Sequence, residues 1–154
     1  MSVTASQADT IVKRALEVGR ANKLQPLTVA VLDAGGHLVA FHKEDGASIF
    51  REAIARGKAM GALGLGTDSA NLAKVAADRP AFIQSAFVAT GGQIIPVPGG
   101  VLIKDHSGKV IGAVGISGDV SEADEACGIA GIRTAGLSCA AIKDGRDCHL
   151  KAHL

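Results

Sequence analysis

Two similar hairpin patterns constrain the fold of this chain more than any other feature. In the first, residues 30–41, the turn Asp33-Ala34-Gly35-Gly36 separates two apolar segments. In the second, the turn Asp105-His106-Ser107-Gly108 separates residues 101–104 from residues 109–117. An aspartate side chain can accept a hydrogen bond from the backbone two residues on, and glycine adopts a positive φ without a Cβ clash. Each pattern therefore predicts two antiparallel strands joined by a tight turn, with the first pair at residues 27–33 and 37–43.

The segments outside the hairpins have the spacing of helices. Apolar residues recur every three or four positions over residues 7–21, after a capping-box pattern of Ser6 and Asp9. We expect further helices at residues 47–63, 71–77, 81–87 and 122–135, the last beginning at a second capping-box pattern of Ser121 and Asp124. Residues 93–95 are expected as an edge strand or a loop, and residues 139–141 as one more strand or part of the tail.

The order of these elements predicts the fold class. Helices stand at both ends and in the middle of a sheet built from hairpins, whereas parallel strand–helix–strand alternation is absent. We therefore expect one α+β domain over residues 1–154, with a profilin-like or PAS-like antiparallel sheet flanked by helices. Residues 137–154 are a C-terminal tail to which the pattern assigns no structure.

Charge and composition exclude several classes of function. The 154 residues include 16 Lys and Arg against 15 Asp and Glu, and a net charge of +1 provides no electrostatic attraction to nucleic acid. No signal peptide and no long uninterrupted apolar run is present, so we expect a soluble cytoplasmic protein that does not enter a membrane. The three cysteines lack the spacing of a zinc ribbon and are odd in number, which argues against a disulfide framework.

Small side chains dominate the apolar residues. The chain has 20 Gly and no Trp or Tyr, so its burial depends on close approach of backbones. Close approach favours tight packing of helix on sheet and of subunit on subunit. We therefore expect a homo-oligomer.

His37 is the first candidate for chemistry, because glycines precede it in the turn and allow a ligand to come near the ring. It could ligate an iron, act as a general base, or simply be a polar residue of a hairpin. His42 and His106 are expected to be exposed. In the tail, His149 and His153 have the i, i+4 spacing of a metal site if that segment is helical, and a frayed terminus otherwise.

Arg51 and Lys58 form the second candidate. They lie two turns apart on one stripe of the expected helix 47–63, where paired cations can hold a carboxylate. The alternative is a solvated helix edge. Asp124 and Glu125 are expected to stabilise a helix N-terminus.

Familiar nucleotide and hydrolase motifs are absent. The segment Gly112-Ala113-Val114-Gly115-Ile116-Ser117-Gly118 lacks the spacing of a dinucleotide fingerprint or a P-loop, and Ser117 does not stand in a G-x-S-x-G elbow. No C-x-x-C-H motif for covalent haem occurs.

Several motifs together resemble the GlcG/HbpS family, which includes the C-terminal domain of PduO-type corrinoid adenosyltransferases. They are the stretch from Val31 to Phe41 with Ala-Gly-Gly-His, Asp45-Gly46-Ala47, Lys58-Ala59, Gly99-Gly100-Val101, the segment 112–118 and Asp124-Glu125-Ala126-Cys127. The resemblance implies a profilin-like fold, homo-oligomers, and haem or iron binding in some members, sometimes with haem degradation. It implies that His37 stands in the ligand pocket, lined by Gly99 and Gly100. Leu102 departs from the family, which commonly has Pro after Gly-Gly-Val.

These observations lead to three hypotheses. The first is a cytoplasmic, oligomeric protein that binds haem or a related tetrapyrrole, with His37 as iron ligand and Arg51 and Lys58 as partners of its acid groups. The second is a lyase or isomerase of a catabolic pathway that acts on an organic acid, with His37 as general base and Lys58 as carboxylate anchor. The third is a noncatalytic accessory subunit.

Overall fold

The two predicted hairpins form one sheet. The computed structural model describes residues 1–143, and within them four antiparallel strands lie in the order β2-β1-β4-β3. Their bounds are Thr28–Asp33 for β1, Leu38–Lys43 for β2, Gly100–Lys104 for β3 and Val110–Ser117 for β4. Each hairpin supplies one central and one edge strand, because all of β1 pairs with residues 112–117 of β4.

The two turns have the chemistry that the sequence predicts. Asp33 Oδ1 accepts the backbone N–H groups of Gly35 and His37, each at 2.9 Å. Asp105 Oδ1 accepts those of Ser107 and Lys109, at 2.9 and 3.0 Å. Gly36 and Gly108, the last residues of the two turns, have φ values of +82° and +87°, which a side chain would strain.

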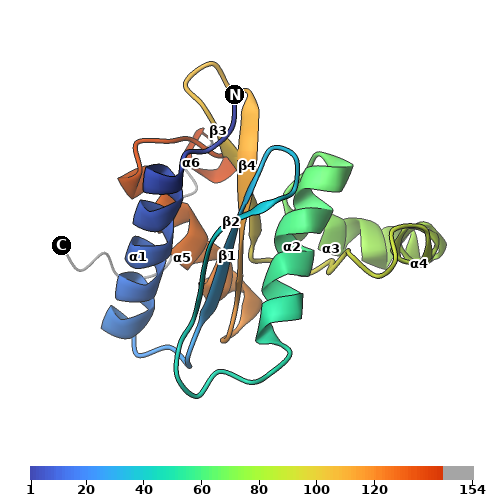
Figure 1. Cartoon of the computed structure of the whole chain (residues 1–154). Helices are drawn as coiled ribbons and strands as arrows, with labels where there is room; N and C mark the ends of the chain where they lie inside the picture. The colour runs from blue at the N-terminus through green and yellow to red at the C-terminus, as the bar shows by residue number, and fades with distance from the viewer. Residues whose placement is uncertain (144–154) are drawn as a thin grey trace.

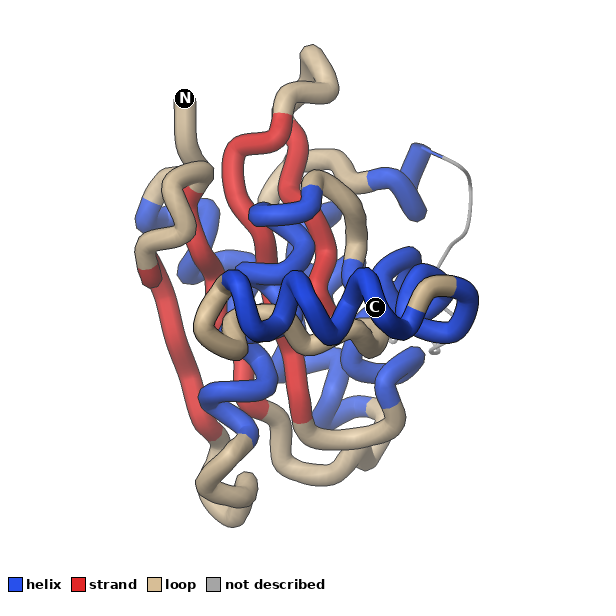
Figure 2. Tube along the Cα trace, turned by 90° about the vertical axis from the view of Figure 1, so that its right-hand side faces the viewer, coloured by secondary structure: helices blue, strands red, loops and turns tan. Residues whose placement is uncertain are grey.

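Helices cover both faces of the sheet (Figure 1). Helices α1, Ala5–Ala21, and α5, Ser121–Thr134, pack on one face, and α2, Arg51–Leu65, packs on the other. Helices α3, Ser69–Asp78, and α4, Pro80–Ala89, extend from α2 away from the sheet, and the short α6, Ala140–Lys143, follows α5. Seen from the side of α4, the strands run side by side behind this helical layer (Figure 2). The predicted α+β fold with an antiparallel sheet is confirmed.

The core differs between the two faces. Branched side chains such as Ile11, Val29 and Ile116 fill the space between the sheet and α1 and α5. The α2 face is lined by alanines together with two leucines, and a Cβ placed on Gly115 would strike the carbonyl oxygen of Ala55. Helix α2 therefore lies unusually close to β4, as the abundance of small residues predicts.

The expected cap of the first helix is wrong by two residues. Thr4, and not Ser6, precedes α1: its hydroxyl accepts the N–H of Gln7 at 3.2 Å, and the Gln7 side chain accepts the N–H of Thr4 at 3.0 Å. The second expected capping box is also wrong. Val120 stands at the N-cap of α5, and Asp124 has a different role, described below.

Three further expectations can be compared with the structure. Helix α2 begins at Arg51 and not at residue 47, so the predicted start is wrong. Residues 93–95 form the loop that was one of the two alternatives, and the Ile95 N–H donates to Gly57 O of α2 at 3.3 Å. In place of a strand at 139–141, Cys139 is buried and α6 begins at the next residue. His149 and His153 lie outside the described residues.

No helix within residues 1–143 combines the length and the apolar character needed to cross a membrane.

Candidate functional site

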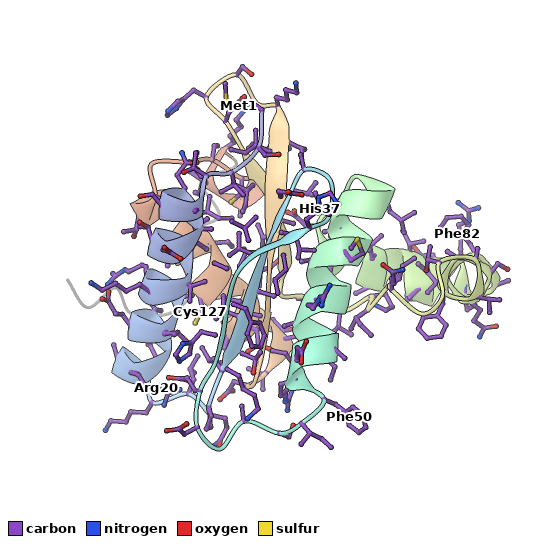
Figure 3. The ribbon with its side chains drawn as sticks, in the orientation of Figure 1. Met1, Arg20, His37, Phe50, Phe82 and Cys127 are labelled. Atoms are coloured by element: carbon purple, nitrogen blue, oxygen red, sulfur yellow. The ribbon has the colours of Figure 1, made fainter. Side chains whose placement is uncertain are left out.

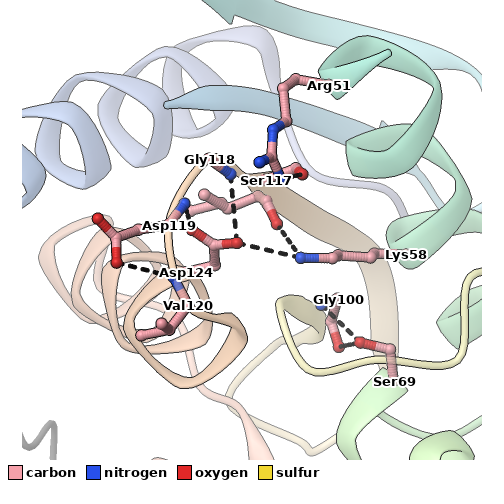
Figure 4. Close-up of polar contacts among 10 residues, drawn as sticks. Arg51, Lys58, Ser69, Gly100, Ser117, Gly118, Asp119, Val120 and Asp124 are labelled. Carbon is pink, nitrogen blue, oxygen red and sulfur yellow. Dashed lines mark hydrogen bonds and ion pairs between the residues drawn. The ribbon is translucent and has the colours of Figure 1, made fainter. Parts of the chain in front are cut away.

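A buried ion pair lies at the end of β4. The ammonium of Lys58, on α2, donates to Asp124 Oδ2, on α5, at 3.1 Å and to the carbonyl oxygen of Ile116 at 2.8 Å. Both charged side chains are almost fully buried. Asp124 also accepts the backbone N–H groups of Gly118 at 3.3 Å and Asp119 at 3.0 Å, so its carboxylate closes the chain turn that follows β4 (Figure 4).

Burial disfavours the charged form of both Lys58 and Asp124. Removal from water lowers the pKa of Lys58 and raises the pKa of Asp124, and in each case the charge of the partner opposes the shift. The backbone groups that contact the two side chains compensate part of the lost hydration. The pair is therefore held by hydrogen bonds to the backbone as well as by the attraction between the two charges.

Gly99 and Gly100 enclose Lys58. A Cβ on Gly99, whose φ is +121°, would lie 2.9 Å from the Lys58 ammonium nitrogen, and one on Gly100 would strike the Lys58 carbonyl oxygen. The Gly100 N–H donates to Ser69 Oγ at 2.7 Å. The two glycines thus make room for a buried lysine.

Arg51 lies near this ion pair but has its own partner. Its guanidinium donates to the buried Ser117 hydroxyl at 3.0 Å (Figure 4). The stripe of α2 that carries Arg51 and Lys58 is one that faces the sheet, whereas Phe50, at the start of the helix, is exposed. The expectation that both cations are open to a ligand carboxylate is therefore not met in this arrangement.

His37 lies on the surface of the protein, beside α2 (Figure 3). Its side chain is 80% exposed, and Nδ1 lies 3.2 and 3.3 Å from the two oxygens of Asp33. The His37 backbone N–H is the main cause that lowers the pKa of the Asp33 carboxyl. Because Asp33 holds Nδ1, Nε2 is the ring nitrogen that a ligand can reach.

The His37 turn touches a pair of surface grooves through Met60. A Cβ on Gly36 would lie 3.0 and 3.1 Å from the Met60 methyl carbon and sulfur. Met60 and Gln93 line both grooves. The Arg56 groove, of about 390 Å³, is further lined by Ile49, Glu52, Ala53, Arg56, Gly57 and Gly92. The Leu65 groove, of about 400 Å³, is further lined by Gly61, Gly64, Leu65, Ala89, Thr90 and Ile94.

The structure therefore divides the predicted site residues into two groups. Lys58, Gly99 and Gly100 come together in the interior with Arg51 close by, and His37 stands on the surface. Met60 and Arg56 were not predicted from the sequence, because periodicity does not show which face of an Ala- and Gly-rich helix is exposed. Asp33 was identified for its turn alone, although its i, i+4 spacing from the histidine is also that of a side-chain partner.

Comparison with known proteins agrees with the fold. The crystal structure of a PduOC–heme complex has a TM-score of 0.80 and 21% identity, covering 90% of this chain and 98% of the other. The crystal structure of HbpS has a TM-score of 0.75 and 22% identity, covering 86% and 89%. Protein ORFY of Klebsiella pneumoniae has a TM-score of 0.78 and 21% identity, covering 87% and 90%. At such identities the likeness shows the fold alone, and a search of curated proteins found no match.

The family is shown by a different comparison. The model of the family described as "Haem degrading protein HbpS-like" matches residues 3–133, most of the chain and all of the sheet. This match confirms the resemblance that the sequence motifs indicated. The chain belongs to the HbpS-like family.

Proposed function

We propose that this protein binds haem or a related metallotetrapyrrole, with His37 Nε2 as the ligand to the metal. The observation that carries the proposal is the contact of Asp33 with His37 Nδ1 on an imidazole that is otherwise open to solvent. A carboxylate on one ring nitrogen fixes the tautomer and the ring orientation and makes the other nitrogen a better ligand. A single protein imidazole suits haem iron, because the macrocycle supplies the equatorial nitrogens.

Apolar surface next to the turn supports the same ligand. Met60 contacts the His37 turn at Gly36 and also lines the Arg56 groove. Ile49 and Ala53 are further apolar residues of that groove. Ligand sites of this kind combine apolar walls with a few polar groups that fix orientation. The family description and the heme complex among the structural relatives agree with a tetrapyrrole.

Arg56 is our candidate partner for the acid groups of the ligand. It lines the groove and is partly exposed, and Glu52, at 4.0 Å, is its weak ion-pair partner. An exposed guanidinium can bind a carboxylate through two parallel hydrogen bonds. In this proposal Arg56 replaces Arg51 and Lys58, whose charged groups are directed into the protein.

The hypothesis of an organic-acid lyase or isomerase required His37 and Lys58 to act on one substrate. The Lys58 ammonium is buried against Ile116 and Asp124, whereas His37 is on the surface. The geometry therefore favours ligand binding over that reaction. As further parts of the proposal, the protein acts in the cytoplasm and assembles with itself.

A haemin titration followed at the Soret band tests the proposal. We expect a saturable shift in the wild type and its loss, or a more than about tenfold weaker binding, in His37→Ala. His106→Ala is the matched control, because His106 stands in the equivalent turn of the second hairpin and should leave the titration unchanged. Arg56→Ala should weaken binding without changing the position of the Soret band.

The competing outcomes are distinct. Equal titrations for wild type and His37→Ala would remove His37 as the ligand. No saturable Soret shift in the wild type would refute tetrapyrrole binding and favour an accessory subunit. Circular dichroism of each variant verifies that the fold is intact.

A further inference from the structure

Met60 and His37 lie against adjacent glycines of the same hairpin turn. A Cβ on Gly36 would lie 3.1 Å from the Met60 sulfur, and a Cβ on Gly35 would lie 2.9 Å from His37 Cε1, the ring carbon between the two nitrogens. Figure 3 shows His37 beside α2, the helix that carries Met60. Two different elements therefore bring a thioether sulfur and an exposed imidazole to one turn.

The Met60 side chain has the freedom and the space to bind a ligand held by the histidine. Methionine is unbranched, with three rotatable bonds and a polarizable sulfur. Met60 is partly exposed and lines both the Arg56 groove and the Leu65 groove. A Cβ on Gly64, one turn further along α2, would meet nothing within 4 Å. The surface beside the thioether is therefore open to a large, flat molecule.

The other side chains that commonly ligate haem iron do not stand in this position. Of the described residues that line the two grooves, Met60 is the one with a sulfur atom, and none is His or Cys. His42 pairs with Val29, whose side chain belongs to the core on the α1 and α5 face, so His42 lies on the face opposite α2. Cys127 and Cys139 are buried. Met60 is therefore the strongest second donor near His37.

We infer that Met60 Sδ is the second axial ligand of the tetrapyrrole iron, opposite His37 Nε2. This inference rests on the proposed function, because it requires a metallotetrapyrrole bound through His37. The hairpin turn supplies one ligand and α2 supplies the other. Ligation by Met and His is an established arrangement for haem iron, and it raises the reduction potential.

Two protein ligands leave the iron without an open coordination position. An added molecule such as cyanide or imidazole then binds only by displacing the thioether. Breakdown of haem requires oxygen to reach the iron, so this ligation suits a protein that holds the tetrapyrrole intact. It would separate this chain from the haem degradation that the description of its family names.

Absorption and electron paramagnetic resonance spectra of the ferric haemin complex test the inference. We expect a low-spin wild type with the far-red charge-transfer band that a thioether ligand gives to ferric haem. Met60→Leu, which nearly conserves the side-chain volume, should lose that band, convert the complex to high spin and lower its reduction potential. Met60→His should restore the low-spin spectrum without the band. The chain has two methionines, so Met1, which remains in both variants, is the internal control.

The outcomes separate this inference from the proposed function. A saturable Soret shift with a high-spin wild-type spectrum would overturn ligation by Met60 and leave haem binding through His37 in place. A far-red band that persists in Met60→Leu, with the fold intact by circular dichroism, would assign the thioether to Met1 and would also overturn the inference. The absence of any saturable shift in the wild type would refute both proposals.

Discussion

The Lys58 ammonium nitrogen lies 3.1 Å from Asp124 Oδ2, although the helices that carry them cover opposite faces of the sheet. The two side chains meet at the end of β4, where the carbonyl oxygen of Ile116 accepts a second hydrogen bond from the same ammonium. One buried ion pair therefore links all three layers of the fold. Its position suggests a structural role, which mutation can measure.

Breaking this ion pair should be strongly destabilising. Lys58→Met leaves Asp124 buried without its cation, and Asp124→Asn leaves the Lys58 ammonium buried without its anion. We expect each single variant to lose about 3–5 kcal/mol of unfolding free energy in urea denaturation. The double variant should lose clearly less than the sum, because neither charge then remains. Additive losses would show that the two groups do not interact energetically.

Acid should destabilise the protein through the aspartates of its turns. Hydrogen bonds lower the pKa of three carboxyls below the ordinary 3.8: that of Asp33 chiefly through the His37 N–H, that of Asp105 through the Ser107 hydroxyl, and that of Asp119 through the Gln25 N–H. A lowered folded-state pKa means that the unfolded chain takes up protons first as the pH falls. Their contribution to stability is therefore present above pH 3.8 and lost as the pH falls through the folded-state values.

The measurement compares urea unfolding at pH 5 and pH 3. The doubly substituted Asp33→Asn/Asp105→Asn variant should lose less stability over this interval than the wild type, because two of the titrating groups are gone. The variant must be compared with the wild type, because both proteins contain Asp124. The pKa of Asp124 is raised in the folded state, so its protonation favours folding and opposes the effect of the other aspartates. Identical pH dependence of the two proteins would contradict the prediction.

Two glycine substitutions should have opposite effects. Gly115→Ala places a methyl group against the Ala55 carbonyl and must push α2 from the sheet, at a cost of about 1–3 kcal/mol or more. Gly64→Ala, on α2, meets nothing within 4 Å and should stabilise the helix by up to about 1 kcal/mol. Thermal denaturation of both variants gives the signs. A neutral Gly115→Ala would mean that α2 does not approach the sheet so closely.

The cap of α1 provides a compact test of local structure. Thr4→Ala removes the hydroxyl that accepts the Gln7 N–H and should cost about 1 kcal/mol of unfolding free energy. Ser6→Ala alters the residue that the sequence pattern suggested as the cap, and it should change stability by less than about 0.5 kcal/mol. A larger loss in Ser6→Ala than in Thr4→Ala would reverse the assignment of the cap.

The hairpins could be predicted because their determinants are local. Asp33 and Asp105 each accept N–H groups within four residues of themselves, and Gly36 and Gly108 provide the positive φ at the end of each turn. The same motifs identified the family, which the family model confirms over residues 3–133. The start of α1 was less well predicted, because Thr4 and Ser6 are both good cap residues and each is followed three residues later by a polar side chain, Gln7 or Asp9.

By itself, the sequence determined the antiparallel α+β fold and the two turns, through hydrogen bonds and backbone conformations set within a few residues. Only the tertiary structure decided which stripe of α2 faces the sheet. That stripe carries Lys58, a residue normally at the surface, and it is buried because Gly99 and Gly100 leave space beside it and Asp124 neutralises its charge. Those partners lie far from Lys58 in the sequence, so no local pattern records them. In this orientation of α2, Met60 and Arg56 lie on the outer side of the helix. Both line the Arg56 groove, and Met60 also lies next to the hairpin turn that carries His37.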